Sequence, residues 1–196
     1  MQLVLKNMNA KNPDGTRVLN LKGKAAVFLI GLSGVGKTAM LLWLLKRRVE
    51  ACEGPKSRGG YKKQQWRLVC HDPPPGFEIG DERSKTVLLR SAPLGELEGV
   101  DTPGAGETDG VNLDVANCMC ITHAFKECGS ATLAWVISAE HLKSRAMLFR
   151  KNLGLMARLM PTAFKDGMYR CILPLFTHAD NFSDIQYELF SILSDK

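Results

Sequence analysis

Residues 31–38, GLSGVGKT, have the G-x-x-x-x-G-K-T spacing of a phosphate-binding loop. An apolar run of strand length, AAVFLIG at 25–31, precedes the motif, and a Leu-rich segment without Gly or Pro, 37–50, follows it. These two segments predict a buried strand and a helix, which is the context that a phosphate-binding loop requires. Glycines let the backbone approach a ligand closely and adopt conformations that a Cβ disfavours. We expect the amides from Gly34 to Thr38 to point into the loop, at the positive end of the helix dipole.

Two side chains of the loop add further chemistry. Lys37 places a positive charge between the terminal phosphates, and the Thr38 hydroxyl binds Mg²⁺. A glycine turn that happens to precede a helix is the alternative interpretation, which the strand–loop–helix context disfavours. The motif predicts a nucleoside triphosphate, without distinguishing ATP from GTP. The residues that we expect to contact it are Gly31, Ser33, Gly34, Val35, Gly36, Lys37, Thr38 and Ala39.

A second motif, D-x-x-G, occurs as DTPG at 101–104, where a predicted strand ends. Asp101 would hold Mg²⁺ directly or through water, and the Gly104 amide could sense the terminal phosphate. Strings of this form are common, so the position at a strand end carries the interpretation.

A third motif, LFTHAD at 175–180, ends another predicted strand with T-x-x-D. The Asp180 carboxylate can accept hydrogen bonds from the ring N–H and the exocyclic amine of guanine. Adenine presents an acceptor at that ring position and would leave a buried carboxylate unpaired. We therefore expect Thr177, His178 and Asp180 to contact a guanine base. A polar strand end with a helix-capping Asp is the alternative.

The surrounding sequence predicts an α/β fold with a mostly parallel central sheet and helices on both faces. Strand and helix patterns alternate after residue 100, and NPDG marks the turn of an N-terminal hairpin within residues 1–22. The chain would be irregular over 51–84, apart from a short strand in QWRLVC. The remaining expected elements are a hairpin over 86–93 and 95–101, a helix over 111–128, a strand over 131–139, a helix over 141–160, a strand over 171–177 and a helix over 184–194.

Length and composition bound the class of protein. The 196 residues suit one domain, 1–196, and the apolar and charged fractions, 45% and 23%, exclude disordered, collagen-like and coiled-coil chains. No apolar run reaches the length of a membrane span, and the first residues lack the features of a secretory signal. We expect a cytoplasmic protein with reduced cysteines. The Cys and His residues have no zinc-ligand spacing, and Cys118 and Cys120 suit the core of a helix.

Positive charge is concentrated in one segment. Between Lys46 and Arg67 there are eight basic and two acidic residues, a net +6 that equals the formal charge of the whole chain. The segment contains a basic loop, 51–65, with Gly, Pro and Ser. Such a loop can attract an anionic membrane surface, which would make the protein peripheral to a membrane, but a solvated loop is the simpler alternative. The segment lacks the interleaved aromatic residues that stack bases, so we expect no nucleic acid partner.

The order GLSGVGKT, DTPG and LFTHAD resembles that of the GTPases of immunity-associated proteins (GIMAPs), and more distantly that of the chloroplast import receptors of the Toc complex and of the septins. The resemblance covers about residues 24–182. It implies a three-layer P-loop NTPase fold, the G domain, with GTP or GDP and Mg²⁺ as ligands. It also implies a switch threonine that completes the Mg²⁺ site, for which FEIGDERSKT points to Thr86 and then to Ser84. Lys37, Thr86 and Gly104 would then assist catalysis, and Thr38, Thr86 and Asp101 would hold the metal.

Three departures from the family pattern bear on function. His178 stands where a Lys or another long residue is common, and Ala105 follows DTPG where related enzymes carry a water-orienting Gln. An apolar residue cannot orient water, so intrinsic hydrolysis should be slow. The chain also ends at Lys196 before a final base-contacting strand, so we expect either a C-terminally truncated domain or a domain in which this strand is missing.

These patterns leave three functions open. The first is a GTPase switch that forms a homodimer across its nucleotide face, with Glu107 and Thr108 as candidates for water contacts. The second is a scaffold at a membrane surface that binds GTP or GDP without hydrolysing it. The third, an ATP-using enzyme such as a small kinase, leaves the THAD motif unexplained.

Overall fold

The computed structural model describes residues 19–53, 66–79, 89–104, 111–143, 147–159, 172–179, 183, 185 and 186. Within them a five-stranded sheet has the order β4-β5-β1-β6-β7. Four strands run parallel and only β4, at one edge, is antiparallel, so the predicted mostly parallel α/β sheet is confirmed. The strands are β1 (Ala25–Ile30), β4 (Arg90–Leu94), β5 (Leu97–Asp101), β6 (Ser130–Ser138) and β7 (Ile172–Thr177).

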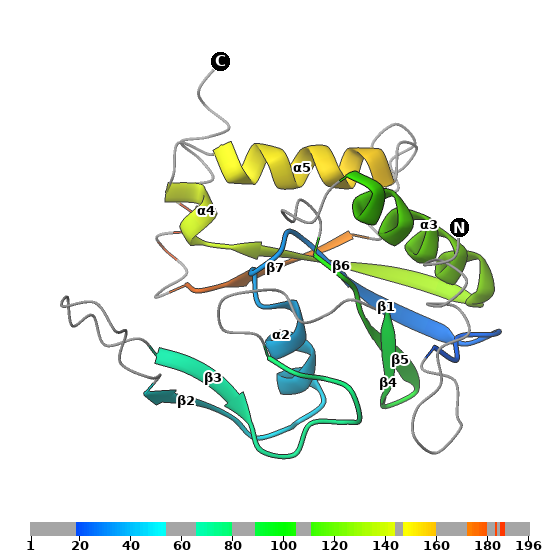
Figure 1. Cartoon of the computed structure of the whole chain (residues 1–196), viewed down its shortest axis with the longest axis horizontal. Coiled ribbons are helices and arrows are strands. Elements are labelled where there is room, and N and C mark those ends of the chain that lie inside the picture. Colours follow the sequence, from blue (N-terminus) through cyan, green and yellow to red (C-terminus); the bar gives the residue numbers. More distant parts are fainter. Residues whose placement is uncertain are drawn as a thin grey trace.

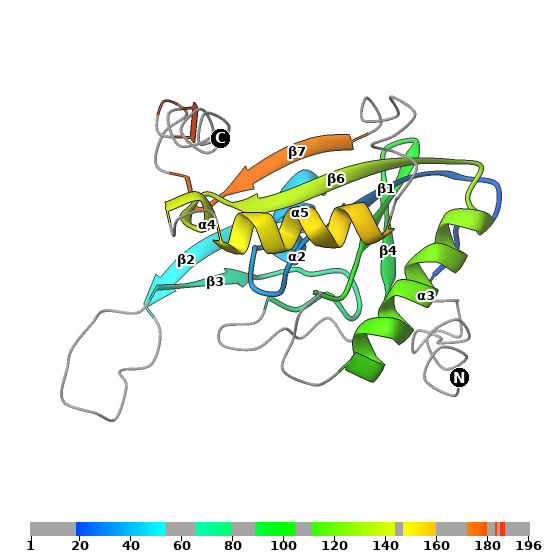
Figure 2. The same cartoon turned by 90° about the horizontal axis from the view of Figure 1, so that it is seen from above.

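Helices cover both faces of this sheet (Figures 1 and 2). The helix α2 (Lys37–Leu44) packs on one face, and α3 (Val111–Glu127), α4 (Glu140–Lys143) and α5 (Met147–Leu159) lie on the other. Successive β1 residues pack into opposite layers: Phe28 and Ile30 join the cluster under α3, whereas Leu29 joins the cluster under α2. A strand that is buried on both faces has no polar alternation, which explains the continuous apolar run at 25–31.

The predicted helix over 37–50 is wrong beyond residue 44. α2 ends at Leu44, Lys46 has a left-handed backbone with φ of 56°, and β2 (Val49–Glu53) pairs antiparallel with β3 (Trp66–Cys70). The expected irregular stretch at 51–84 therefore holds a two-stranded sheet, and its short strand in QWRLVC is confirmed. Val49 and Cys70 pack beside the core cluster under α2, so tertiary packing overrides the helix propensity of this segment.

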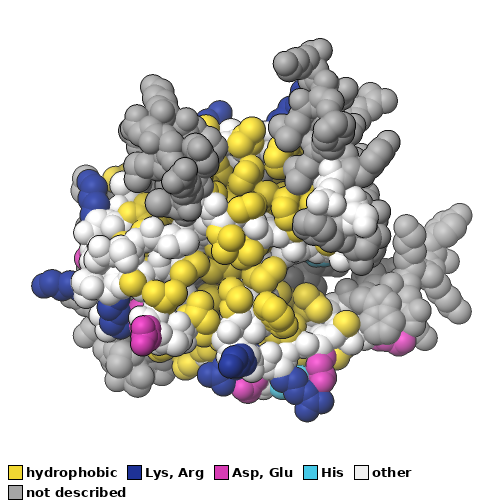
Figure 3. Space-filling view, turned by 180° about the vertical axis from the view of Figure 1, so that it is seen from behind, with side chains coloured by type: hydrophobic (Ala, Val, Ile, Leu, Met, Phe, Trp, Pro, Cys, Tyr) yellow, Lys and Arg dark blue, Asp and Glu magenta, His cyan; other side chains and the backbone are white. Residues whose placement is uncertain are grey.

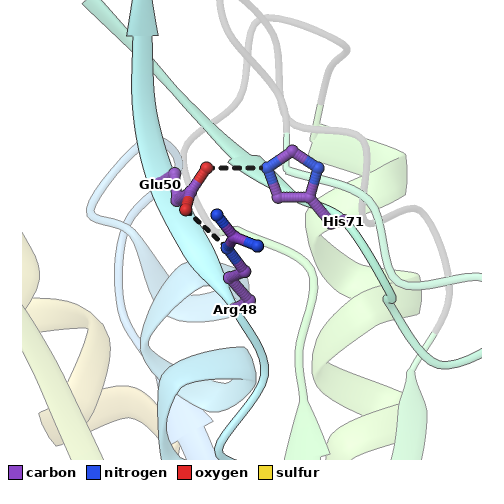
Figure 4. A network of polar contacts seen from close by, with 3 residues as sticks. All are labelled: Arg48, Glu50 and His71. Carbon is purple, nitrogen blue, oxygen red and sulfur yellow. Dashed lines mark hydrogen bonds and ion pairs between the residues drawn. The ribbon is translucent and has the colours of Figure 1, made fainter.

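Charged residues tie together the two strands of this small sheet. Glu50 accepts hydrogen bonds from Arg48 Nε and His71 Nε2, at 2.5 and 2.9 Å (Figure 4). Arg47 pairs with Asp72 at 2.8 Å. The Arg48 contact, followed by that of His71, lowers the pKa of Glu50 below its usual value. Arg47 and Arg48, which fall within the helix predicted over 37–50, thus contact residues of this small sheet and its flanks instead.

Other expected elements agree with the structure to different degrees. The hairpin predicted before residue 101 is confirmed as β4–β5, as are the helix at 111–128 and the strands at 131–139 and 171–177. The helix over 141–160 corresponds to α4 and α5, and residues 144–146 between them lie outside the described residues. Most of the N-terminal hairpin, residues 1–18, lies outside the described residues, and 19–22 form no strand. The helix over 184–194 also falls outside them, except for two residues, 185 and 186.

Some large apolar side chains are exposed. Trp43 on α2 and Leu173 on β7 expose 66% and 52% of their surface. Figure 3 shows apolar side chains gathered on the face seen from behind, where β7 forms the edge of the described sheet. No helix in the described part of the chain combines the length and the apolar character needed to cross a membrane.

Candidate functional site

The motif residues meet where four parallel strands end. In the sheet register Leu29 pairs with Asp101, Ile30 with Trp135 and Ser138 with Thr177, so the carboxyl ends of β1, β5, β6 and β7 share one edge. Ligands of open α/β sheets bind outside such an edge. Three motifs that lie far apart in the sequence are thereby brought together.

The loop at 31–38 has the backbone that its glycines permit. Gly34 and Gly36 have φ of +76° and +84°, and Gly36 is the N-cap of α2. A Cβ at position 31 would lie 2.4 Å from the Val136 carbonyl oxygen, so only glycine allows β1 to turn this close to β6. The loop is therefore a close-packed turn at a helix N-terminus, which is the geometry of an anion-binding cradle.

Lys37 lies across this loop instead of extending into solvent. Its side chain is buried, and Nζ donates to the carbonyl oxygens of Leu32, at 2.9 Å, and Gly31, at 3.3 Å. Burial of an ammonium group is costly unless polar groups surround it. The carbonyl oxygens of Gly31 and Leu32 hold the Lys37 ammonium against the loop.

A hydroxyl and a carboxylate lie together beside the loop. Thr38 Oγ1 donates to Asp101 Oδ2 at 2.7 Å, and Asp101 is almost fully buried at the end of β5. Mg²⁺ prefers oxygen ligands and retains waters and substrate phosphates, so two protein oxygens of this kind suffice for it. The described residues contain no group of three His, Cys, Asp or Glu that could hold a metal without such a substrate. The pair fits a Mg²⁺ ion that accompanies a polyphosphate.

The DTPG segment is fixed against the phosphate-binding loop. Thr102 Oγ1 donates to the Leu29 carbonyl at 2.7 Å from a fully buried position. A Cβ at Gly104 would lie 2.5 Å from Ser33 Cα, so glycine is required for the approach of the two segments. The Gly104 backbone thus lies next to the loop, as the motif predicts.

The THAD segment also contacts the loop. Thr177 Oγ1 donates to the Val35 carbonyl oxygen at 2.6 Å, across 142 residues of sequence. A Cβ at Gly36 would lie 3.7 Å from His178 Cε1, and His178 has a left-handed backbone with φ of 53°. The beginning of the predicted base-reading motif is therefore attached directly to the predicted phosphate-reading motif.

The sequence reasoning missed His141, which follows β6 at the same edge. Burial lowers the pKa of His141, Glu140 acts in the opposite direction, and the charge of His178 lowers it further. His141 follows β6 and His178 follows β7, so the two histidines come after the ends of neighbouring strands that pair in the sheet. No motif contains His141, so only the strand order could reveal this pairing.

Asn152 is a second residue that the sequence did not indicate. It is fully buried on α5, accepts a hydrogen bond from Trp135 Nε1 at 3.0 Å, and donates to the Val136 carbonyl oxygen at 3.3 Å. That oxygen is the atom against which Gly31 packs. Asn152 thus helps to fix the strand backbone that supports the loop.

Several predicted site residues lie outside the described residues. They are the switch candidates Thr86 and Ser84, the base-reading Asp180, the residue Ala105 and the water-contact candidates Glu107 and Thr108. The same holds for most of the basic loop, 54–65. The described site therefore comprises the phosphate-binding loop, the Thr38–Asp101 pair, Gly104, Thr177 and His178.

Neither models of protein families nor curated proteins give a match to this chain. The functional interpretation consequently depends on the motifs and on the geometry of the site.

We predict that Thr177→Val weakens the link between the two motifs. Loss of the Thr177 hydroxyl leaves the Val35 carbonyl without this donor, which should lower the free energy of unfolding by about 1 kcal/mol. Chemical denaturation measures this change. Thr122→Val is a matched control, because Thr122 donates to the Cys118 carbonyl within the exposed surface of α3. Equal effects of the two substitutions, or none from Thr177→Val, would contradict the predicted link.

We also predict that His141 makes stability depend on pH. Because its folded pKa is below the unfolded value of 6.5, the unfolded chain binds more protons as pH falls below that value. Stability should therefore decrease on acidification below 6.5 and level off above it. Melting temperatures across this range should vary less in His141→Gln than in the wild type. The assignment is wrong if His141→Gln leaves the pH profile unchanged.

Proposed function

We propose that the chain is a guanine-nucleotide-binding protein with the three-layer fold of P-loop NTPases, the G domain, and that it hydrolyses GTP slowly with Mg²⁺. The observation that carries the proposal is the assembly of three motifs at one edge of the sheet. Lys37 is folded over its loop, Thr38 bonds to Asp101, Gly104 approaches Ser33, and Thr177 bonds to Val35. Such packing is expected for a polyphosphate cradle with an adjacent metal site and base site.

Each part of the site has a role in this proposal. The amides of residues 31–39 and the Lys37 ammonium would bind the phosphates, while Thr38, Asp101 and Thr86 would hold Mg²⁺, which offsets charge on the phosphate oxygens. Thr177, His178 and Asp180 would hold the base, and the guanine edge would supply two N–H donors to the Asp180 carboxylate.

Slow hydrolysis follows from Ala105, which offers no polar atom to orient an attacking water. We infer that a second copy, docked across the nucleotide face, supplies the missing group, so that hydrolysis is coupled to homodimerisation. A scaffold that binds guanine nucleotide without turnover is the alternative, and the same apolar residue favours it.

The first test of the proposal is Lys37→Ala. Removal of the ammonium should abolish binding of GDP with Mg²⁺ in calorimetric titrations, because a charge-assisted phosphate contact and the support of the loop are both lost. Lys22→Ala, which removes an exposed lysine, should bind as the wild type does. A folded Lys37→Ala protein with unchanged affinity would refute the assignment.

The second test concerns the base. Asp180→Asn replaces a carboxylate acceptor with an amide that can donate, so preference should shift from guanosine toward xanthosine nucleotides, which carry a carbonyl in place of the exocyclic amine. Competition between the two diphosphates measures the shift. Retention of full guanosine selectivity by Asp180→Asn would exclude Asp180 as the residue that reads the base.

A further inference from the structure

The outward face of α5 is apolar and basic in a pattern that nucleotide binding does not use. Phe149, Asn152 and Met156 are buried, and Phe149 stacks on Trp135 with ring centroids 5.7 Å apart. The opposite side of the helix is exposed and forms what we call the α5 outer face: Met147, Arg150, Lys151, Leu153, Ala157 and Arg158. The spacing of three and four residues places these side chains on one side of the helix.

The α5 outer face carries only positive charge. The helix MLFRKNLGLMARL contains three basic residues and no acidic residue. None of the ion pairs between described residues involves Arg150, Lys151 or Arg158. The cations of this face thus have no carboxylate partner in the described part of the chain.

Two large apolar side chains project among these cations. Met147 is 69% exposed and Leu153 is 37% exposed. A Cβ at Gly154, on the same side of the helix, would meet no atom within 4 Å. The α5 outer face therefore combines basic side chains, the exposed apolar side chains Met147 and Leu153, and a glycine, Gly154, so it is not uniformly polar.

The position of α5 makes this face accessible to a flat partner. Figures 1 and 2 show α5 in the outer layer over β6, with its axis lying along the surface of the molecule. In the view from above, no other described element covers it. The helix can therefore contact a planar surface along its whole length.

We propose that the α5 outer face docks onto an anionic lipid bilayer. Arg150, Lys151 and Arg158 would contact the headgroups, and Met147 and Leu153 would enter the boundary between headgroups and acyl chains. This differs from the membrane site that the sequence suggested, the basic loop at 51–65, because it lies on a helix whose Phe149, Asn152 and Met156 pack against the sheet. It does not depend on the proposed nucleotide site.

A bilayer fits this face better than an acidic protein does. The charges are distributed along the exposed side of a helix, and no ion pair between described residues fixes their positions, unlike the fixed polar partners of a protein hot spot. Exposed cations beside the exposed Met147 and Leu153 suit a surface that is anionic at its headgroups and apolar beneath them.

Vesicle sedimentation of the whole chain tests the proposal. The wild type should bind phosphatidylcholine vesicles that contain phosphatidylserine, bind pure phosphatidylcholine weakly, and dissociate as salt is raised. Arg150→Glu with Lys151→Glu should weaken binding by about tenfold or more, because each basic residue contributes separately. The matched control, Lys22→Glu with Lys126→Glu, makes the same charge change at exposed positions elsewhere and should bind as the wild type does.

Further arms distinguish a bilayer from other anions. Met147→Ser with Leu153→Ser should also weaken vesicle binding while leaving the melting temperature near that of the wild type. The proposal fails if the wild type ignores phosphatidylserine, or if the control pair loses as much binding as the α5 pair. A further result would also overturn the proposal: Met147→Ser with Leu153→Ser binds vesicles as the wild type does, and polyglutamate binds to α5 as tightly as vesicles do. The α5 outer face would then recognise an acidic polypeptide instead of a bilayer.

Discussion

The backbone packing of the 31–38 loop against its neighbours is the constraint on which the site depends. Gly31 lies against the Val136 carbonyl, Gly104 lies against Ser33, and Thr177 donates to Val35. Each contact joins the loop to a different strand end. Side chains at the two glycine positions would force those strands apart, and the Thr38–Asp101 pair would be lost with them.

Contacts through β6 also connect the site to α5. Asn152, on α5, bonds to the same Val136 carbonyl that contacts Gly31. Trp135 bonds to Asn152 and stacks on Phe149, so the inner face of α5 supports β6 directly beneath the loop. The outer face of the same helix carries the cations for which we propose a lipid partner. The helix α5 thus supports the 31–38 loop through β6 on its inner side and carries the proposed lipid-binding residues on its outer face.

The sequence predicted those features that arise from local pattern. The run at 25–31 indicated β1 because burial on both faces leaves no polar alternation, and the motif at 31–38 indicated the loop because glycine spacing reflects backbone geometry. The helix prediction was wrong after Leu44. Leu, Lys and Arg favour a helix there, but Val49 and Cys70 pack against the α2 cluster, and this packing favours a strand. Asn152 and His141 could not be found in this way. Their roles depend on which strands are neighbours in the sheet, and a local sequence pattern does not predict the strand order.

We propose that a guanine nucleotide binds at the carboxyl ends of β1, β5, β6 and β7. The most direct measurement is chromatography of whatever the purified protein releases on heating, together with its thermal shift on addition of guanosine or adenosine diphosphate with Mg²⁺. We expect released GDP or GTP, and stabilisation by the guanosine compound alone. A protein that releases nothing and shows no shift with guanosine phosphates and Mg²⁺, or that responds to adenosine phosphates instead, would contradict it.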